Sequence, residues 1–89
     1  MPALVTITVP LDITVYEQMS AGLAPHLATA PGFRAHGAYP VEGGFVVTEI
    51  WDSAAEHEAF FDAAIKPHLA DGASVKVIEL RNAIVGGQR

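Results

Sequence analysis

Two hydrophobic periods alternate along the chain. In residues 3–9 (ALVTITV), every second residue from Val5 onward is valine or isoleucine, which is the two-residue period of a β-strand. The residues between them are only weakly polar, so we expect this strand to be covered on both faces. The following segment has a helical period instead, with apolar residues four positions apart at Val15, Met19, Leu23 and Leu27.

Residues 14–29 are predicted to form the first helix. Thr14 followed three residues later by Glu17 is a capping-box pattern. Pro25 lies inside the helix, where it lacks the N–H that would bond the carbonyl of Ala21. We therefore expect a kink at this point, or a second short helix after it.

Residues 33–39 (FRAHGAY) and 44–51 (GFVVTEIW) alternate as two further strands. The segment PVEG between them predicts a hairpin whose turn is longer than two residues. In the first strand, His36 shares a face with Arg34 and Ala38, opposite Tyr39. In the second strand, one face carries Phe45, Val47, Glu49 and Trp51. Glu49 is the polar exception on that face, and Arg81 is its expected partner if it faces the interior.

A second helix is predicted over residues 54–70. Ser53 and Glu56 repeat the capping box, and Pro67 should bend or shorten the last turn. Residues 75–82 alternate as a fourth strand, and residues 84–89 are expected to fray. The order βαββαβ predicts one α+β, ferredoxin-like domain over residues 1–89 with a four-stranded antiparallel sheet.

Composition points to a partner subunit and away from nucleic acid. The chain has 89 residues, of which 51% are hydrophobic and only 17% charged, and a chain this small has much surface to cover. We expect some of the apolar surface to meet another chain. The net charge of −5 would repel a phosphate backbone. With no signal-like start and no apolar run of about 18 residues, the expected location is the cytoplasm, without a membrane segment.

The sequence offers no standard metal or cofactor motif. It contains no cysteine, which excludes disulfides, thiolate nucleophiles and cysteine-ligated metals. Its four histidines have no HxH, HxxxH or HExxH spacing, and no GxGxxG or GxxxxGK[ST] run is present. We therefore predict no metal and no cofactor.

Several residues could line a ligand pocket, and each also has a structural interpretation. His36 could act as a general base near neutral pH, or simply bond a backbone carbonyl in its strand. Tyr39 and Tyr16 could donate to a substrate oxygen, although both residue types also suit the rim of a core. Trp51 could stack on a planar ligand, but core packing beneath the helix start is the stronger expectation.

The second helix carries a stripe with a polar group at each end. Its members lie at helical spacing and are His57, Phe60, Phe61, Ala64 and His68. Such a stripe suits the wall of a pocket for an aromatic ligand, or equally a core with histidines at its edges. His57 is expected in the pocket, whereas His68 and His26 are expected at the surface.

Four stretches resemble small antibiotic-biosynthesis-monooxygenase-like domains of the dimeric α/β-barrel superfamily, over nearly the whole chain. They are PGFRAH, GGFVVTEIWDS, AFF and VIELRNAIV. The resemblance implies a homodimer in which two sheets form a barrel, with the helices outside and a pocket between helices and sheet. Relatives include cofactor-independent oxygenases of aromatic polyketides, haem-degrading enzymes, polyketide cyclases and isomerases. Many of them carry a histidine where this chain has Phe60, which weakens the haem-degrading alternative.

Three functions remain open from the sequence. The first is a cofactor-independent monooxygenase of an aromatic, polyketide-type small molecule, with His36 and Tyr39 as catalytic groups. The others are a cyclase or isomerase that uses histidine and tyrosine for proton transfer, and a non-catalytic ligand-binding or accessory dimer. In the first two, Trp51, Tyr16 and the stripe from His57 to Ala64 would hold the aromatic rings.

Overall fold

The computed structural model describes residues 1–84 and has the predicted βαββαβ order. Strand β1 (Ala3–Val9) leads to helix α1 (Ile13–Ala28), and strands β2 (Phe33–Val41) and β3 (Gly44–Trp51) form a hairpin. Helix α2 (Ala54–Phe60) continues into a π-helical turn (Phe61–Ile65) and a 3-10 turn (Lys66–His68) before strand β4 (Ser74–Glu79). The α+β, ferredoxin-like fold is confirmed.

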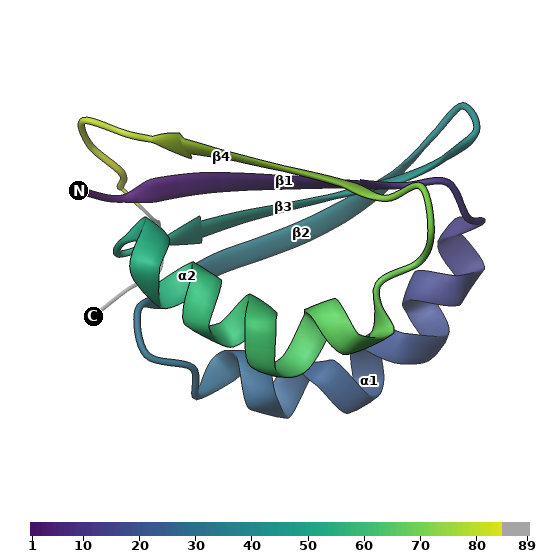
Figure 1. Ribbon diagram of the computed structural model, residues 1–89, viewed down its shortest axis with the longest axis horizontal. Helices are drawn as coiled ribbons and strands as arrows, with labels where there is room; N and C mark the ends of the chain where they lie inside the picture. The colour runs from purple at the N-terminus through teal and green to yellow at the C-terminus, as the bar shows by residue number, and fades with distance from the viewer. Residues whose placement is uncertain (85–89) are drawn as a thin grey trace.

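The four strands form one antiparallel sheet in the order β2-β3-β1-β4. Both helices lie against the same face of this sheet, which leaves the opposite face uncovered (Figure 1). Directly opposed residues in an antiparallel pair share a face, so the register assigns the side chains of the uncovered face. These include Thr6 and Thr48, which oppose each other, and Tyr39 of the edge strand.

The two-residue period of β1 places its valines and isoleucine in the core. Val5, Ile7 and Val9 are buried between sheet and helices, and the alternate positions are not. The expectation that β1 is covered on both faces is therefore not met within one chain. Burial of each large apolar side chain contributes roughly 1.5–3 kcal/mol, which fixes the helices to this face.

Helix α1 begins one residue earlier than predicted. Asp12 is its N-cap, because Asp12 Oδ1 accepts from the backbone N–H of Thr14 at 2.9 Å. The helix also runs through Pro25 to Ala28 instead of dividing there. Both Pro25 and Ala21 are exposed, so water can bond the carbonyl that Pro25 leaves without a donor.

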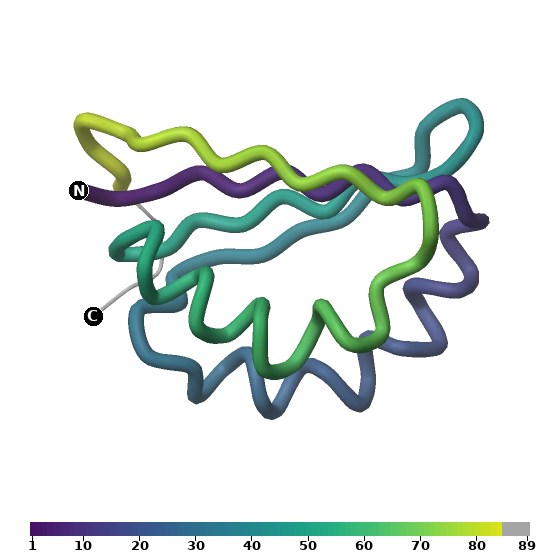
Figure 2. Tube along the Cα trace, viewed as in Figure 1, coloured from purple at the N-terminus to yellow at the C-terminus, as the bar shows by residue number. Residues whose placement is uncertain are grey.

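The β2–β3 hairpin is tighter than predicted. Only Glu42 and Gly43 separate the strands, and Gly43 has φ +83°, a left-handed value that glycine adopts at the third residue of a tight turn. Pro40 lies within β2, which tolerates it because β2 is an edge strand. Figure 2 shows the turn reaching beyond the rest of the sheet.

A β-bulge between Phe33 and Ala35 alters the predicted faces of β2. Phe33 opposes Trp51 and His36 opposes Glu49, so Phe33 faces the helices together with His36. Strict alternation had placed Phe33 on the opposite face with Tyr39. The extra residue at the bulge, Arg34, forms an ion pair with Asp52.

The second helix is not a continuous α-helix to residue 70. The N–H of Lys66 donates to the carbonyl of Phe61, the wide pattern of a π-turn, and Pro67 shortens the segment as expected. Strand β4 ends at Glu79, so Arg81 lies beyond it. Of the predicted frayed tail, Ile84 is highly exposed and residues 85–89 lie outside the described residues. Within residues 1–84, no helix is long and apolar enough to cross a membrane.

Candidate active site

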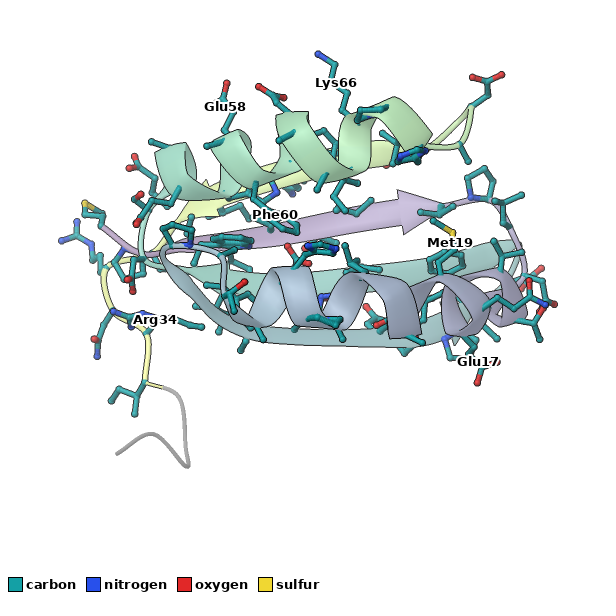
Figure 3. All side chains as sticks on the ribbon, turned by 90° about the horizontal axis from the view of Figure 1, so that it is seen from below. Glu17, Met19, Arg34, Glu58, Phe60 and Lys66 are labelled. Atoms are coloured by element: carbon teal, nitrogen blue, oxygen red, sulfur yellow. The ribbon has the colours of Figure 1, made fainter. Side chains whose placement is uncertain are left out.

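A cavity of about 480 Å³ lies between the two helices and the covered face of the sheet. Its wall is mostly apolar and comes from β1, both helices, the π-turn, and the facing sides of β2 and β3. Figure 3 shows Phe60 and Met19 projecting into the space between the helices, while Glu58 and Lys66 point away. A cavity of this size and polarity suits a drug-sized apolar ligand.

Four side chains form a continuous hydrogen-bonded chain at the sheet wall of this cavity. The hydroxyl of Tyr16 lies 2.5 Å from Nε2 of His36, and Nδ1 of His36 lies 2.7 Å from Oε2 of Glu49. The indole N–H of Trp51 donates to Oε1 of Glu49 at 2.9 Å. Tyr16, His36 and Glu49 border the cavity, whereas Trp51 lies behind them.

The donors and acceptors in this series of hydrogen bonds follow from the chemistry of the four side chains. Glu49 is buried, and an ionised carboxylate can only accept, so His36 must donate from Nδ1. In the neutral imidazole, Nε2 is then the acceptor and receives the hydroxyl proton of Tyr16. This arrangement leaves the lone pairs of the Tyr16 oxygen free for a ligand. In this tautomer, Nε2 of His36 can accept a proton from Tyr16.

Local structure brings these residues together. His36 and Glu49 are directly opposed across the β2–β3 ladder, and Glu49 and Trp51 are two residues apart on one strand face. Tyr16 comes from the first turn of α1, and its ring stacks on that of His36 with centroids 5.8 Å apart. Burial, together with the negative charge of Glu49, raises the pKa of Tyr16, so its phenol is neutral near pH 7.

His57 is a second titratable group of the cavity. It is only 4% exposed, and its ring centroid lies 5.6 Å from that of Trp51, which it meets edge to face, and 5.5 Å from that of Phe61, to which it is tilted. Burial lowers the pKa of His57, against the opposing effect of nearby carboxylates, of which Glu49 acts most strongly. The side chain is therefore neutral at physiological pH.

The structure brings most of the predicted site residues to one cavity. Those on its wall are Tyr16, His36, His57, Phe60, Phe61 and Ala64. His68 and His26 are exposed as expected, yet both also border the cavity at its rim.

Two predicted site residues do not contact the cavity. Tyr39 is half exposed on the uncovered face of the sheet, because it is an odd number of positions from His36 along β2. Trp51 is fully buried, and its indole N–H bonds Glu49 behind the cavity wall. The proposed Glu49–Arg81 pair is wrong, since Glu49 bonds His36 and Trp51.

Sequence reasoning missed the role of Glu49 and most of the aliphatic wall. Glu49 did carry a signal, as the one polar residue on an apolar strand face. The aliphatic wall includes Leu11, Met19, Leu23 and Ile65, which look like ordinary core residues in sequence. Among residues 1–84, no three histidine, aspartate or glutamate side chains are grouped to hold a metal ion.

No family model matches the chain, and no curated protein matches its sequence. Solved structures do match it. A haem-degrading protein from Mycobacterium tuberculosis has a TM-score of 0.71 at 21% identity, with 97% of this chain and 98% of that chain covered.

Two oxygenases from Streptomyces also match. The monooxygenase ActVA-Orf6 of Streptomyces coelicolor, solved with nanaomycin D, has a TM-score of 0.70 at 18% identity and covers 93% of this chain and 90% of its own. SnoaB, a cofactor-independent oxygenase from Streptomyces nogalater, has a TM-score of 0.64 at 15% identity, with coverages of 93% and 95%. The chain therefore has the same ferredoxin-like α+β fold as the haem-degrading protein and the two oxygenases.

Proposed function

We propose that this protein is a cofactor-independent monooxygenase of an aromatic, polyketide-type small molecule. The observation that carries the proposal is the Tyr16–His36–Glu49 hydrogen-bonded chain at the wall of an otherwise apolar cavity. Such a site can hold fused rings and remove one proton from them. The similar folds of two oxygenases, one of them solved with nanaomycin D, agree with this assignment.

In the proposed mechanism, the proton leaves the substrate through Tyr16. The Tyr16 oxygen accepts the substrate proton while its own proton passes to Nε2 of His36, 2.5 Å away. The imidazolium that forms lies 2.7 Å from the Glu49 carboxylate, which stabilises the positive charge. The product of this step is a resonance-stabilised substrate anion held in an apolar cavity.

The oxygen step needs no reductant other than the substrate. The anion of an activated ring methylene forms a C–O bond to O₂, and protonation by the relay gives a hydroperoxide. Loss of the second methylene proton with cleavage of the O–O bond then gives a carbonyl and water. The methylene loses four electrons and O₂ gains four, so CH₂ and O₂ become C=O and H₂O.

The uncovered face of the sheet supports a homodimer. Its exposed residues include Tyr39, Val41 and Ile78, while Thr6 and Thr48 supply weakly polar side chains. Lys76, opposite Thr6, is the one charged residue within residues 1–84 that strand pairing places on this face. A broad, weakly polar sheet face is expected to pack against another chain. A second copy that packs its own sheet there would close the barrel and leave both cavities on the outside.

Oxygen uptake with a panel of anthrones, which carry an activated ring methylene, tests the function, with ¹⁸O₂ used to trace the new oxygen atom. We expect His36→Ala to lower turnover by about 100- to 10,000-fold, the usual effect of losing a general base. Tyr39→Phe, on the far face, is the matched control and should retain turnover. Unchanged turnover by His36→Ala would refute the mechanism.

The same assay separates the alternatives. Conversion that proceeds equally well without oxygen would show proton transfer only, as in a cyclase or isomerase. Tight binding of the panel without any conversion would show a ligand-binding protein.

A further inference from the structure

We infer that His57 recognises a second oxygen function on the ligand, a carbonyl or hydroxyl other than the group that meets Tyr16. The inference rests on the proposed function in taking the cavity as the substrate pocket. It adds a specificity-determining residue and narrows the substrate class to aromatic molecules that carry oxygen at two separate positions.

The first observation is that His57 is buried without a polar partner. The residue is 4% exposed, and the hydrogen bonds of the site join Tyr16, His36, Glu49 and Trp51 without a ring nitrogen of His57. Yet none of the described polar side-chain atoms is both fully buried and unpaired. The ring nitrogens of His57 therefore keep some accessible surface, and His57 is one of the residues that line the cavity.

The second observation is that aromatic neighbours fix the ring. Trp51 and Phe61 hold it from two sides, with centroid distances of 5.6 and 5.5 Å. Trp51 is itself held by its hydrogen bond to Glu49. His57 cannot easily turn toward solvent, so its free nitrogen is a fixed polar point on an apolar wall.

The protonation state of His57 determines which ligand groups its ring can bind. Burial favours the neutral ring, while the negative charges of Glu49, Glu58 and Asp62 act in the opposite direction. A neutral imidazole offers one donor and one acceptor, which suits either a carbonyl or a hydroxyl. A ligand without oxygen at this position would leave the imidazole unpaired in the filled cavity, and such sites reject the plain analogue.

The position differs from that of the proton-transfer chain. His36 and Tyr16 come from β2 and α1, whereas His57 comes from α2. One oxygen function of a fused-ring ligand can thus meet Tyr16 while another meets His57. The two contacts would fix which ring carbon is oriented for reaction.

Calorimetric titration with a matched pair of probes tests this inference without requiring turnover. Naphthalene-1,5-diol carries hydroxyls on both rings, and 1-naphthol lacks the second one. We expect the diol to bind wild-type protein about 3- to 10-fold more tightly, the effect of one hydrogen bond in a buried site. His57→Phe should remove this preference, His57→Gln should restore part of it, and the control Tyr39→Phe should leave it unchanged.

An NMR measurement on the wild-type protein covers the case in which His57→Phe does not fold. The ¹⁵N shift of the His57 ring should change with the diol and not with 1-naphthol. An equal response to both probes, or an undiminished preference in folded His57→Phe, would overturn the inference.

Failure of this inference can be distinguished from failure of the proposed function. Discrimination between the probes without oxygen uptake on any substrate would defeat the oxygenase proposal alone. Oxygen uptake without discrimination would defeat only the role of His57. If neither probe binds at millimolar concentration, the cavity is not a pocket for aromatic ligands, and both the proposed function and the role of His57 are refuted.

Discussion

Replacing Glu49 by glutamine should reverse the hydrogen-bonded chain at the proposed active site. The Glu49 carboxylate accepts from two donors, Nδ1 of His36 and the indole nitrogen of Trp51. Glutamine keeps the shape but offers only one acceptor oxygen, and its amide is itself a donor. Since the indole can only donate, the amide oxygen should face Trp51 and the amide nitrogen should face His36.

His36 must then change tautomer. Its Nδ1 becomes an acceptor for the amide, so the proton moves to Nε2 and points at Tyr16. In that form Nε2 cannot take a proton from Tyr16, and an imidazolium would have no carboxylate beside it. We expect oxygen-uptake activity to fall by about 100- to 10,000-fold, the range for loss of general-base catalysis.

The same substitution should also lower stability. Glu49 is 6% exposed, and glutamine would replace two hydrogen bonds to a charged group, about 1.5–3 kcal/mol each, by neutral ones of about 0.5–1.5 kcal/mol, a loss of about 2 kcal/mol in all. In a domain of this size that corresponds to a fall in Tm on the order of 10 °C. Glu17→Gln is the matched control, because Glu17 is exposed on α1 and points outward (Figure 3). It should change neither stability nor activity.

Histidine ¹⁵N NMR measures the tautomer directly and needs no substrate. Wild-type His36 should carry its proton on Nδ1, and Glu49→Gln should move it to Nε2. A wild-type ring protonated on Nε2, or one whose tautomer is unaffected by the substitution, would refute the reasoning.

Three further predictions concern stability and assembly. Trp51→Phe removes the indole donor to Glu49 and shrinks a fully buried side chain, so urea unfolding should show a loss of about 1–3 kcal/mol. The lowered pKa of His57 stabilises the fold above its unfolded value of 6.5, and this contribution is lost as the pH falls toward the folded pKa. Urea melts should therefore show a shallower acid-side decline for His57→Phe than for wild type. Lysine at both Thr6 and Thr48, which are opposed on the uncovered face, should convert a dimer into monomer in light scattering after gel filtration.

Each of these predictions has a result that contradicts it. Wild-type stability in Trp51→Phe would mean that Glu49 does not depend on the indole donor. Parallel pH curves for wild type and His57→Phe would mean that His57 titrates alike in the folded and unfolded chains. A double lysine variant that stays dimeric would place the interface elsewhere, and Ala24→Lys on the exposed side of α1 is the control for added charge.

The element order could be predicted from the sequence because each element follows a local rule. The two-residue period of residues 3–9 and the four-residue spacing from Val15 to Leu27 depend only on which face is buried. The predictions were wrong where the position of a neighbouring strand determines the local structure. β2 continues through Pro40 because that strand is at the sheet edge, and the bulge at Arg34 places Phe33 on the same face as His36.

The sequence by itself determined the βαββαβ order, the apolar face of β3 and the presence of Glu49 as the one polar residue on that face. Only the tertiary structure decided which side chains Glu49 bonds. The β2–β3 register sets His36 opposite Glu49, and the packing of α1 brings Tyr16 to Nε2 of His36. Alternation along β2 leaves Tyr39 on the opposite face of the sheet, and packing beneath the helices buries Trp51. A period assigns a residue to a face, but distances between elements depend on register and packing, which no local pattern encodes.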